Sequence, residues 1–196
     1  MSNFIPFKNI NRDYASSWDI PYQILLNTIE WREFRELIIN RDNRKCQICD
    51  KEESEKLGNQ FFSKPSEEEI KENSKKLPHD LGGDGLDVLQ LSNVEIFGTP
   101  IDNPTVLHVH HKYYIFGNLP WEYQGEGLLT VCHNCHTKIH DNEKIPFYVD
   151  SNFKEKLNLT ECVRCNGTGF LREYLHVQSG IRFRCQGRKY EEFIKQ

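Results

Sequence analysis

Two stretches decide the fold: Leu107-His108-Val109-His110-His111-Lys112 and Cys132-His133-Asn134-Cys135-His136-Thr137-Lys138-Ile139-His140. The first stretch lies in residues 106–115, whose β-branched and aromatic content is typical of a strand. The second follows a short apolar segment, Leu128–Val131, which we expect to form another strand. Residues 133–140 then fit a helix. The order strand, strand, helix is therefore the predicted centre of the fold.

The histidines of these stretches have the spacing of a metal site. His136 and His140 are four residues apart and share one helical face. A third ligand must come from another element, and the pair His110-His111 is the obvious supplier. Adjacent residues of a strand point to opposite faces, so one histidine can hold a metal while the other stands apart, provided the strand ends or bulges there. This division suits phosphodiester hydrolysis, in which a metal neutralises phosphate charge and a neutral imidazole takes a proton from water.

The seven cysteines indicate metal binding rather than disulfides. Their number is odd, and the chain begins without a basic and apolar secretion signal. Two residues between thiolates allow a tight turn to direct both sulfurs at one ion about 2.3 Å away, and two such turns complete a tetrahedron. We therefore predict a structural zinc site, with redox-active dithiols as the alternative. Its four ligands are Cys46, Cys49, Cys132 and Cys135.

Composition limits the class of protein. The chain has 196 residues, of which 37% are hydrophobic and 12% aromatic, so it can bury a compact core. No apolar run approaches the roughly 18 residues of a membrane span, and we expect a cytoplasmic protein with no membrane partner. The net charge is −4, but residues 50–102 hold 13 acidic and 6 basic residues, a net charge of −7. An acidic insert therefore hides a mildly basic remainder.

The expected organisation has five parts. A helix over residues 19–40 should precede the first cysteine pair. The parts are the N-terminal helix and first half of the zinc knuckle (1–49), the acidic insert (50–102), the core (103–145), a linker (146–160) and a small tail (161–196).

The combined pattern resembles the HNH endonuclease family over roughly residues 31–49 and 105–141. The resemblance implies an α+β fold with a ββα-metal core, in which a two-stranded hairpin and a helix hold one divalent metal beside a four-cysteine zinc knuckle. It also implies DNA as the substrate. Mg²⁺ is the first choice of metal, with Mn²⁺, Ni²⁺ or Zn²⁺ left open because histidine ligands alone do not select among them. The implied roles are His111 as general base and His110, His136 and His140 as metal ligands.

One position departs from that family pattern. The family often has asparagine just before the second strand, where its side chain helps to orient the base, and this chain has Gly127. A backbone carbonyl of the Gly117–Gly127 loop is the candidate replacement for orienting His111.

The tail contains a third cysteine pair. The run from Cys162 through Cys165-Asn-Gly-Thr-Gly resembles the zinc ribbon of J-domain chaperones, and Cys185 would be a third ligand. Arg182 stands where a fourth cysteine is expected. Either the metal is lost there, or His176 or a water completes a possible second zinc site.

Two other interpretations remain open from the sequence. The chain could be a non-catalytic zinc-binding module that binds nucleic acid or a partner protein. It could also be a nuclease restrained until a protein partner docks on the acidic insert or the tail.

Overall fold

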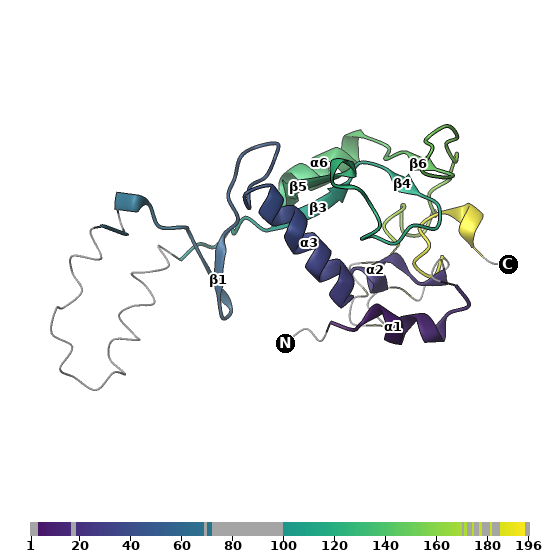
Figure 1. Ribbon diagram of the computed structural model, residues 1–196, viewed down its shortest axis with the longest axis horizontal. Coiled ribbons are helices and arrows are strands. Elements are labelled where there is room, and N and C mark those ends of the chain that lie inside the picture. Colours follow the sequence, from purple (N-terminus) through teal and green to yellow (C-terminus); the bar gives the residue numbers. More distant parts are fainter. Residues whose placement is uncertain are drawn as a thin grey trace.

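The computed structural model describes residues 4–16, 19–68, 70–71, 100–169 and 185–194, together with Leu171, Tyr174, Val177 and Ile181. The chain is of mixed α+β class (Figure 1). Its elements are α1 (Phe7–Ile10), η1 (Asn11–Asp13), α2 (Tyr22–Leu25), α3 (Ile29–Arg41), β1 (Glu55–Leu57), β2 (Gln60–Phe62), β3 (Leu107–His111), β4 (Tyr114–Ile115), η3 (Gly125–Gly127), β5 (Leu128–Cys132), α6 (His133–Asn142), β6 (Phe147–Tyr148) and η6 (Glu191–Phe193).

Strands β3 and β5 form the centre of the fold. They pair antiparallel, and His110 lies opposite Leu129 while His111 lies opposite Leu128. Helix α3 packs against both strands, and so does α6. Because successive residues of a strand alternate in direction, β3 has two distinct faces. We call the side that carries His108 and His110 its metal face, and the side that carries Leu107, Val109 and His111 its core face.

The core face packs against α3. Leu107 and Val109 join a buried cluster with Trp31, Ile38 and Ile39 of that helix. The helix begins at Thr28, whose side chain accepts a hydrogen bond from the Trp31 backbone N–H at 3.2 Å. This capping bond satisfies one of the free N–H groups of the first turn.

The expected single helix over residues 19–40 is wrong in one respect. The structure has two helices, α2 and α3, with Leu26–Thr28 between them. The capping geometry explains the break, since the extended backbone of Thr28 starts a new helix rather than continuing the previous one.

The segment expected as a linker contributes to the body. Strand β6 pairs parallel with β4, so Tyr114 lies opposite Phe147. Further along the chain, Arg188 forms an ion pair of 2.7 Å with Asp19, and the two side chains are only 11% and 13% exposed. The tail therefore packs on the N-terminal part of the body rather than standing apart from it.

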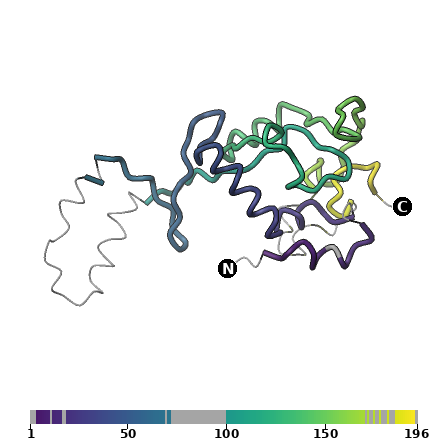
Figure 2. Tube along the Cα trace, in the orientation of Figure 1, coloured from purple at the N-terminus to yellow at the C-terminus, as the bar shows by residue number. Residues whose placement is uncertain are grey.

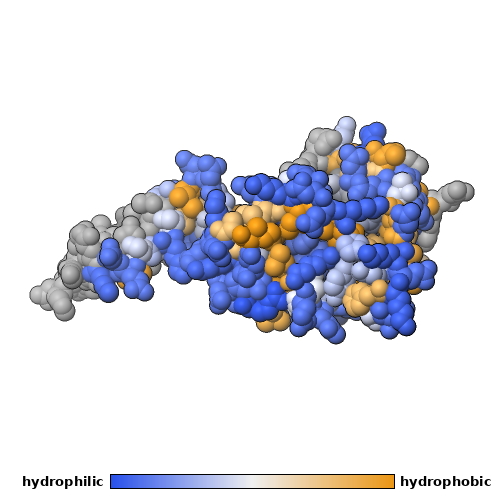
Figure 3. All heavy atoms as spheres, turned by 90° about the horizontal axis from the view of Figure 1, so that it is seen from above, coloured by the Kyte–Doolittle hydropathy of each residue, from blue (hydrophilic) through white to orange (hydrophobic). Residues whose placement is uncertain are grey.

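Part of the acidic insert extends away from that body. Strands β1 and β2 form a short antiparallel hairpin on the far side of α3 from the tail (Figures 1 and 2). The other expected strands of the insert, 88–91 and 94–97, lie outside the described residues. Seen from above, most of the surface is hydrophilic, and apolar residues collect in a band across the body (Figure 3). Among the described helices, none combines the length and apolar character needed to cross a bilayer.

Candidate metal centres and the environment of His111

Three histidines converge on the metal face of β3. His110 comes from the strand, and His136 and His140 come from successive turns of α6; one ring nitrogen of each lies within 4.8 Å of the others. The two Nε2 atoms of His136 and His140 are 3.1 Å apart. Two nitrogens bound at 2.0–2.1 Å to one tetrahedral ion lie about 3.3 Å apart, so the spacing fits a shared metal. We call these residues the histidine triad.

The polar atoms of the triad also fit a metal. His110 is 4% exposed, and its Nδ1 atom is buried with no hydrogen-bond partner among the described residues. A buried polar atom without a partner is costly, and a bound ion would satisfy it. Burial, followed by the nearby charge of His140, lowers the pKa of His110 to about 4. The same two causes lower the pKa of His136 to about 3. Both imidazoles are therefore neutral at pH 7, which is the form that binds metals.

The four predicted zinc ligands also come together. Cys46 and Cys49 lie after α3, while Cys132 ends β5 and Cys135 lies in the first turn of α6; their sulfurs are all within 4.8 Å of one another. The Sγ atoms of Cys49 and Cys132 are 3.7 Å apart. Two thiolates bound to one zinc at 2.3 Å are separated by about 3.75 Å, so this group can hold a structural zinc ion.

The electrostatics of the four-cysteine group agree with that use. Burial raises the pKa of Cys46, but hydrogen bonds from the backbone of Cys132, Cys49 and Ile48 outweigh it and lower that pKa to about 6. Burial and the neighbouring sulfurs raise the pKa of Cys135 to about 12. Four sulfurs at this distance cannot all ionise without a cation between them, and zinc would supply that charge.

His111 lies on the core face, away from the triad. It is 2% exposed, and its ring stacks between Trp31 and Tyr114 with centroid distances of 5.5 Å to each. Strand β3 is regular through His111, so the bulge that would turn this residue toward the metal face is absent from the described backbone. The role of general base for His111 therefore stays a prediction. Being next to His110 in β3 does not by itself bring His111 close to the triad.

Both ring nitrogens of His111 have partners. Nε2 lies 2.9 Å from the Pro120 carbonyl oxygen, and Nδ1 lies 3.4 Å from the Tyr22 hydroxyl. The expected carbonyl of the Gly117–Gly127 loop is thus present at Pro120. Burial lowers the pKa of His111 to about 4, so the ring is neutral at pH 7 and donates to Pro120 from Nε2.

The structure explains the glycine at position 127. A side-chain Cβ at Gly127 would lie 2.6 Å from the Tyr113 hydroxyl and 2.8 Å from the ring carbon that carries it. No side chain fits there while Tyr113 keeps its position. An asparagine at this position would therefore require Tyr113 to move.

The tail brings three further sulfurs together. Cys162, Cys165 and Cys185 are all buried, with Sγ atoms within 4.8 Å of one another, and those of Cys165 and Cys185 are 3.5 Å apart. Three thiols at this spacing can bind a metal. The other two positions of this prediction, His176 and Arg182, lie outside the described residues.

Sequence reasoning missed the residues that surround His111. Tyr22, Trp31 and Tyr114 form its aromatic box, and Lys189 of the tail lies over the Tyr22 ring at 3.7 Å from the centroid. Tyr22 and Lys189 are separated by most of the chain, so no spacing rule could relate them. The sequence shows that Trp31 and Tyr114 are aromatic, but aromatic residues are as typical of a buried core as of a functional site.

Comparison with protein-family models, with curated proteins and with solved structures gave no match to this chain. No family is therefore assigned to the chain.

Proposed function

We propose that this chain is a metal-dependent endonuclease that hydrolyses DNA phosphodiester bonds. The observation that carries the proposal is the histidine triad: three neutral imidazoles from one strand and one helix converge on a point at the protein surface, where His140 is exposed. Three protein ligands leave coordination positions open, as catalytic metal sites require, whereas four thiolates close a structural site. In this proposal the triad is the catalytic centre and the four-cysteine group is the structural one.

The arrangement of elements supports a ββα-metal core of the HNH type. The antiparallel pair β3 and β5 leads directly into α6, and the triad lies between this helix and β3. The four-cysteine group joins the end of α3 to the start of α6. In this proposal it holds the hairpin and helix together while the triad supports the reaction.

The triad residues would bind a divalent ion, Mg²⁺ by preference or Mn²⁺, Ni²⁺ or Zn²⁺. When bound, such an ion neutralises phosphate charge and favours deprotonation of an attacking water. His110, His136 and His140 fix its place with rings that burial keeps neutral. His111 stays the proposed base, but that role would require β3 to bulge so that His111 turns from the core face toward the triad, and its Nε2 to exchange the Pro120 carbonyl for a water molecule.

Two observations favour the alternative of a non-catalytic zinc-binding module, because both count against DNA binding at the triad. Two arginines that could face a phosphate already donate to backbone carbonyls: Arg35 to that of Leu107 at 2.6 Å, and the exposed Arg41 to that of Leu128 at 3.1 Å. A groove beside His140 is lined by three acidic residues, Asp141, Glu143 and Glu161, against one cation, Lys144. These charges would weaken DNA binding near the triad unless a cation offsets them.

Cleavage of supercoiled plasmid separates the two functions. The full chain should nick or cut the plasmid with added Mg²⁺ or Mn²⁺, and EDTA should stop the reaction. His140→Ala should abolish cleavage, because it removes an exposed ligand and leaves the core unchanged. His111→Ala tests the base and should lower the rate by about 10²–10⁴. If the plasmid stays intact with Mg²⁺, Mn²⁺, Ni²⁺ and Zn²⁺ alike, the non-catalytic binding module is the better assignment.

A further inference from the structure

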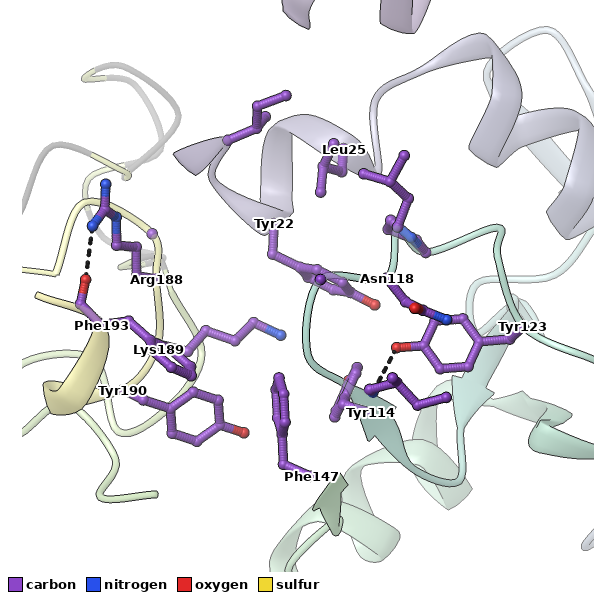
Figure 4. A pocket seen from close by; sticks show the side chains of 16 residues that line it. Tyr22, Leu25, Tyr114, Asn118, Tyr123, Phe147, Arg188, Lys189, Tyr190 and Phe193 are labelled. Atoms are coloured by element: carbon purple, nitrogen blue, oxygen red, sulfur yellow. Dashed lines mark hydrogen bonds between the residues drawn. The ribbon is translucent and has the colours of Figure 1, made fainter. Parts of the chain in front are cut away.

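A small pocket lies between the tail and the body. Its walls come from α2, β4, the loop before Tyr123, β6 and residues 187–193 (Figure 4). Its volume is about 70 Å³. About 10–15 Å³ of such space holds one water, so the pocket has room for a small oxoanion.

The charged side chains of this pocket are both cations. Arg188 is neutralised by its ion pair with Asp19, whose side chain is also largely buried. Lys189 is half-buried, and no carboxylate of the described residues pairs with it. Its Nζ lies 3.7 Å from the Tyr22 ring centroid and 5.3 Å from that of Tyr114. The ring faces compensate part of the charge, and burial lowers the pKa of Lys189 to about 8, so the ammonium persists at pH 7 and an anionic partner would stabilise it.

A second donor accompanies this ammonium. The described residues offer no hydrogen-bond partner for the Tyr190 hydroxyl, and burial raises the pKa of this phenol, so it keeps its proton. In Figure 4 the Lys189 nitrogen and the Tyr190 oxygen both point toward the middle of the pocket. The pocket thus receives an ammonium and a phenol as donors, although the charge of Glu161 also acts on Tyr190.

We propose that this pocket binds a phosphate monoester, with Lys189 and Tyr190 as its direct donors. An ammonium donates charge-assisted hydrogen bonds to phosphate oxygens, and a phenol donates a neutral one. The apolar surroundings of the pocket strengthen such contacts. The choice of phosphate over other oxoanions rests on the proposed function, because the ends of a nicked or cut nucleic acid carry this group. Free phosphate has the same chemistry and could occupy the same place.

Binding of matched oligonucleotides tests the pocket. The probes are a short single strand with a 5′-phosphate, the same strand with a 3′-phosphate, and the same strand with neither, each measured by fluorescence anisotropy on the full chain without added divalent metal. The phosphorylated strands should bind at least about tenfold more tightly, which corresponds to about 1.4 kcal/mol, because a hydrogen bond to a charged group is stronger than a neutral one. Inorganic phosphate should compete with the phosphorylated strands. A preference for the 5′-phosphate over the 3′-phosphate, or the reverse, would identify the ligand as a nucleic-acid end rather than free phosphate.

Three variants assign the effect. Lys189→Gln should remove the phosphate preference, and Tyr190→Phe should reduce it by less because only a hydroxyl is lost. The control is Lys156→Gln, in which an exposed lysine near the Tyr148 ring, at 5.6 Å from its centroid, loses its charge outside the pocket; it should keep the preference. Thermal unfolding of each variant shows whether the fold is intact, and Lys189→Arg, which keeps the charge, should bind phosphate if Lys189→Gln proves unstable.

The outcomes separate this proposal from the nuclease proposal. Equal binding of all three strands, with no competition by inorganic phosphate, would overturn the pocket assignment, and so would a preference that survives in Lys189→Gln. If the protein cleaves plasmid but shows no preference, the pocket proposal alone fails. If it shows a Lys189-dependent preference but cleaves nothing, the nuclease proposal fails and the phosphate pocket stands.

Discussion

His110 and His111 are neighbours in the chain, yet β3 places them in opposite environments. His110 meets the helix α6 on the metal face, where its Nδ1 lacks a partner among the described residues. His111 meets α3 on the core face, where Pro120 and Tyr22 engage both of its nitrogens. A histidine thus has a buried nitrogen without a described partner at one position and two engaged nitrogens in the core at the next. The geometry of the strand, rather than residue type, decides which chemistry each can perform.

Loss of the four-cysteine group should disturb both faces at once and have the largest effect. Cys132→Ser removes a ligand at the point where β5 passes into α6. Structural zinc contributes on the order of 10 kcal/mol to folding, comparable to the whole stability of a domain. We expect this variant to lose one bound zinc and its cooperative unfolding transition, as measured by elemental analysis and circular dichroism.

The control for this variant is Cys185→Ser in the tail, which should keep the zinc of the four-cysteine group. A Cys132→Ser protein that retains both its zinc and a normal melting curve would contradict a structural role for that group.

Changing the metal face alone should remove activity and spare stability. His136→Ala deletes a half-buried ligand of α6, and a catalytic metal supplies several kcal/mol to the reaction, so plasmid cleavage should fall by about 10³. His133→Ala is the matched control, because His133 is exposed on the same helix and outside the triad. Equal losses in the two variants would mean that the triad has no special role.

Burial of His111 on the core face should make the free energy of unfolding depend on pH. The folded pKa of His111 is lowered to about 4 by burial, below the unfolded value of about 6.5. The unfolded chain therefore takes up a proton first as the pH falls, and stability is lost below about pH 6.5 until the folded pKa is reached. Between pH 7 and pH 5 this single group should account for about 2 kcal/mol.

Urea unfolding at the two pH values, compared between the natural chain and His111→Phe, isolates that contribution. The phenyl ring keeps the stack between Trp31 and Tyr114 but cannot titrate, so the variant should show a shallower loss of stability at low pH. An identical loss in both proteins would show that His111 is not a buried neutral imidazole.

The smallest expected effect concerns the loop that supports His111. Gly127→Ala forces a Cβ within 3 Å of the Tyr113 hydroxyl and ring carbon, and overpacking of this kind costs about 1–3 kcal/mol. Chemical denaturation should detect the loss. In a double-mutant cycle, Tyr113→Ala should suppress it, because the colliding ring is gone; additive effects would place the strain elsewhere.

Local spacing predicted the parts of this molecule that depend on neighbouring residues. The period of a helix placed His136 and His140 on one face, and the short interval within each cysteine pair predicted their convergence. Strand β5 and helix α6 were also expected, with small differences at their ends.

Features that depend on distant contacts were not predictable in this way. The parallel pairing of β4 with β6 joins residues about thirty positions apart, and no pattern in residues 146–160 predicts a strand. The packing of Arg188 and Lys189 against Asp19 and Tyr22 joins the two ends of the chain. Alternation along β3 was foreseen, but whether His111 would turn toward the metal depended on the regular register with β5, which only the structure shows.

Metal binding by three proteins tests the assignment of the two faces most directly. The natural chain, His110→Ala and His111→Phe would be dialysed against Co²⁺ or Mn²⁺, and the exchangeable metal would be counted by elemental analysis beside the tightly held zinc. We predict that the natural chain and His111→Phe bind one exchangeable ion that His110→Ala lacks, while all three keep the zinc. Loss of that ion in His111→Phe, or its retention in His110→Ala, would contradict the account.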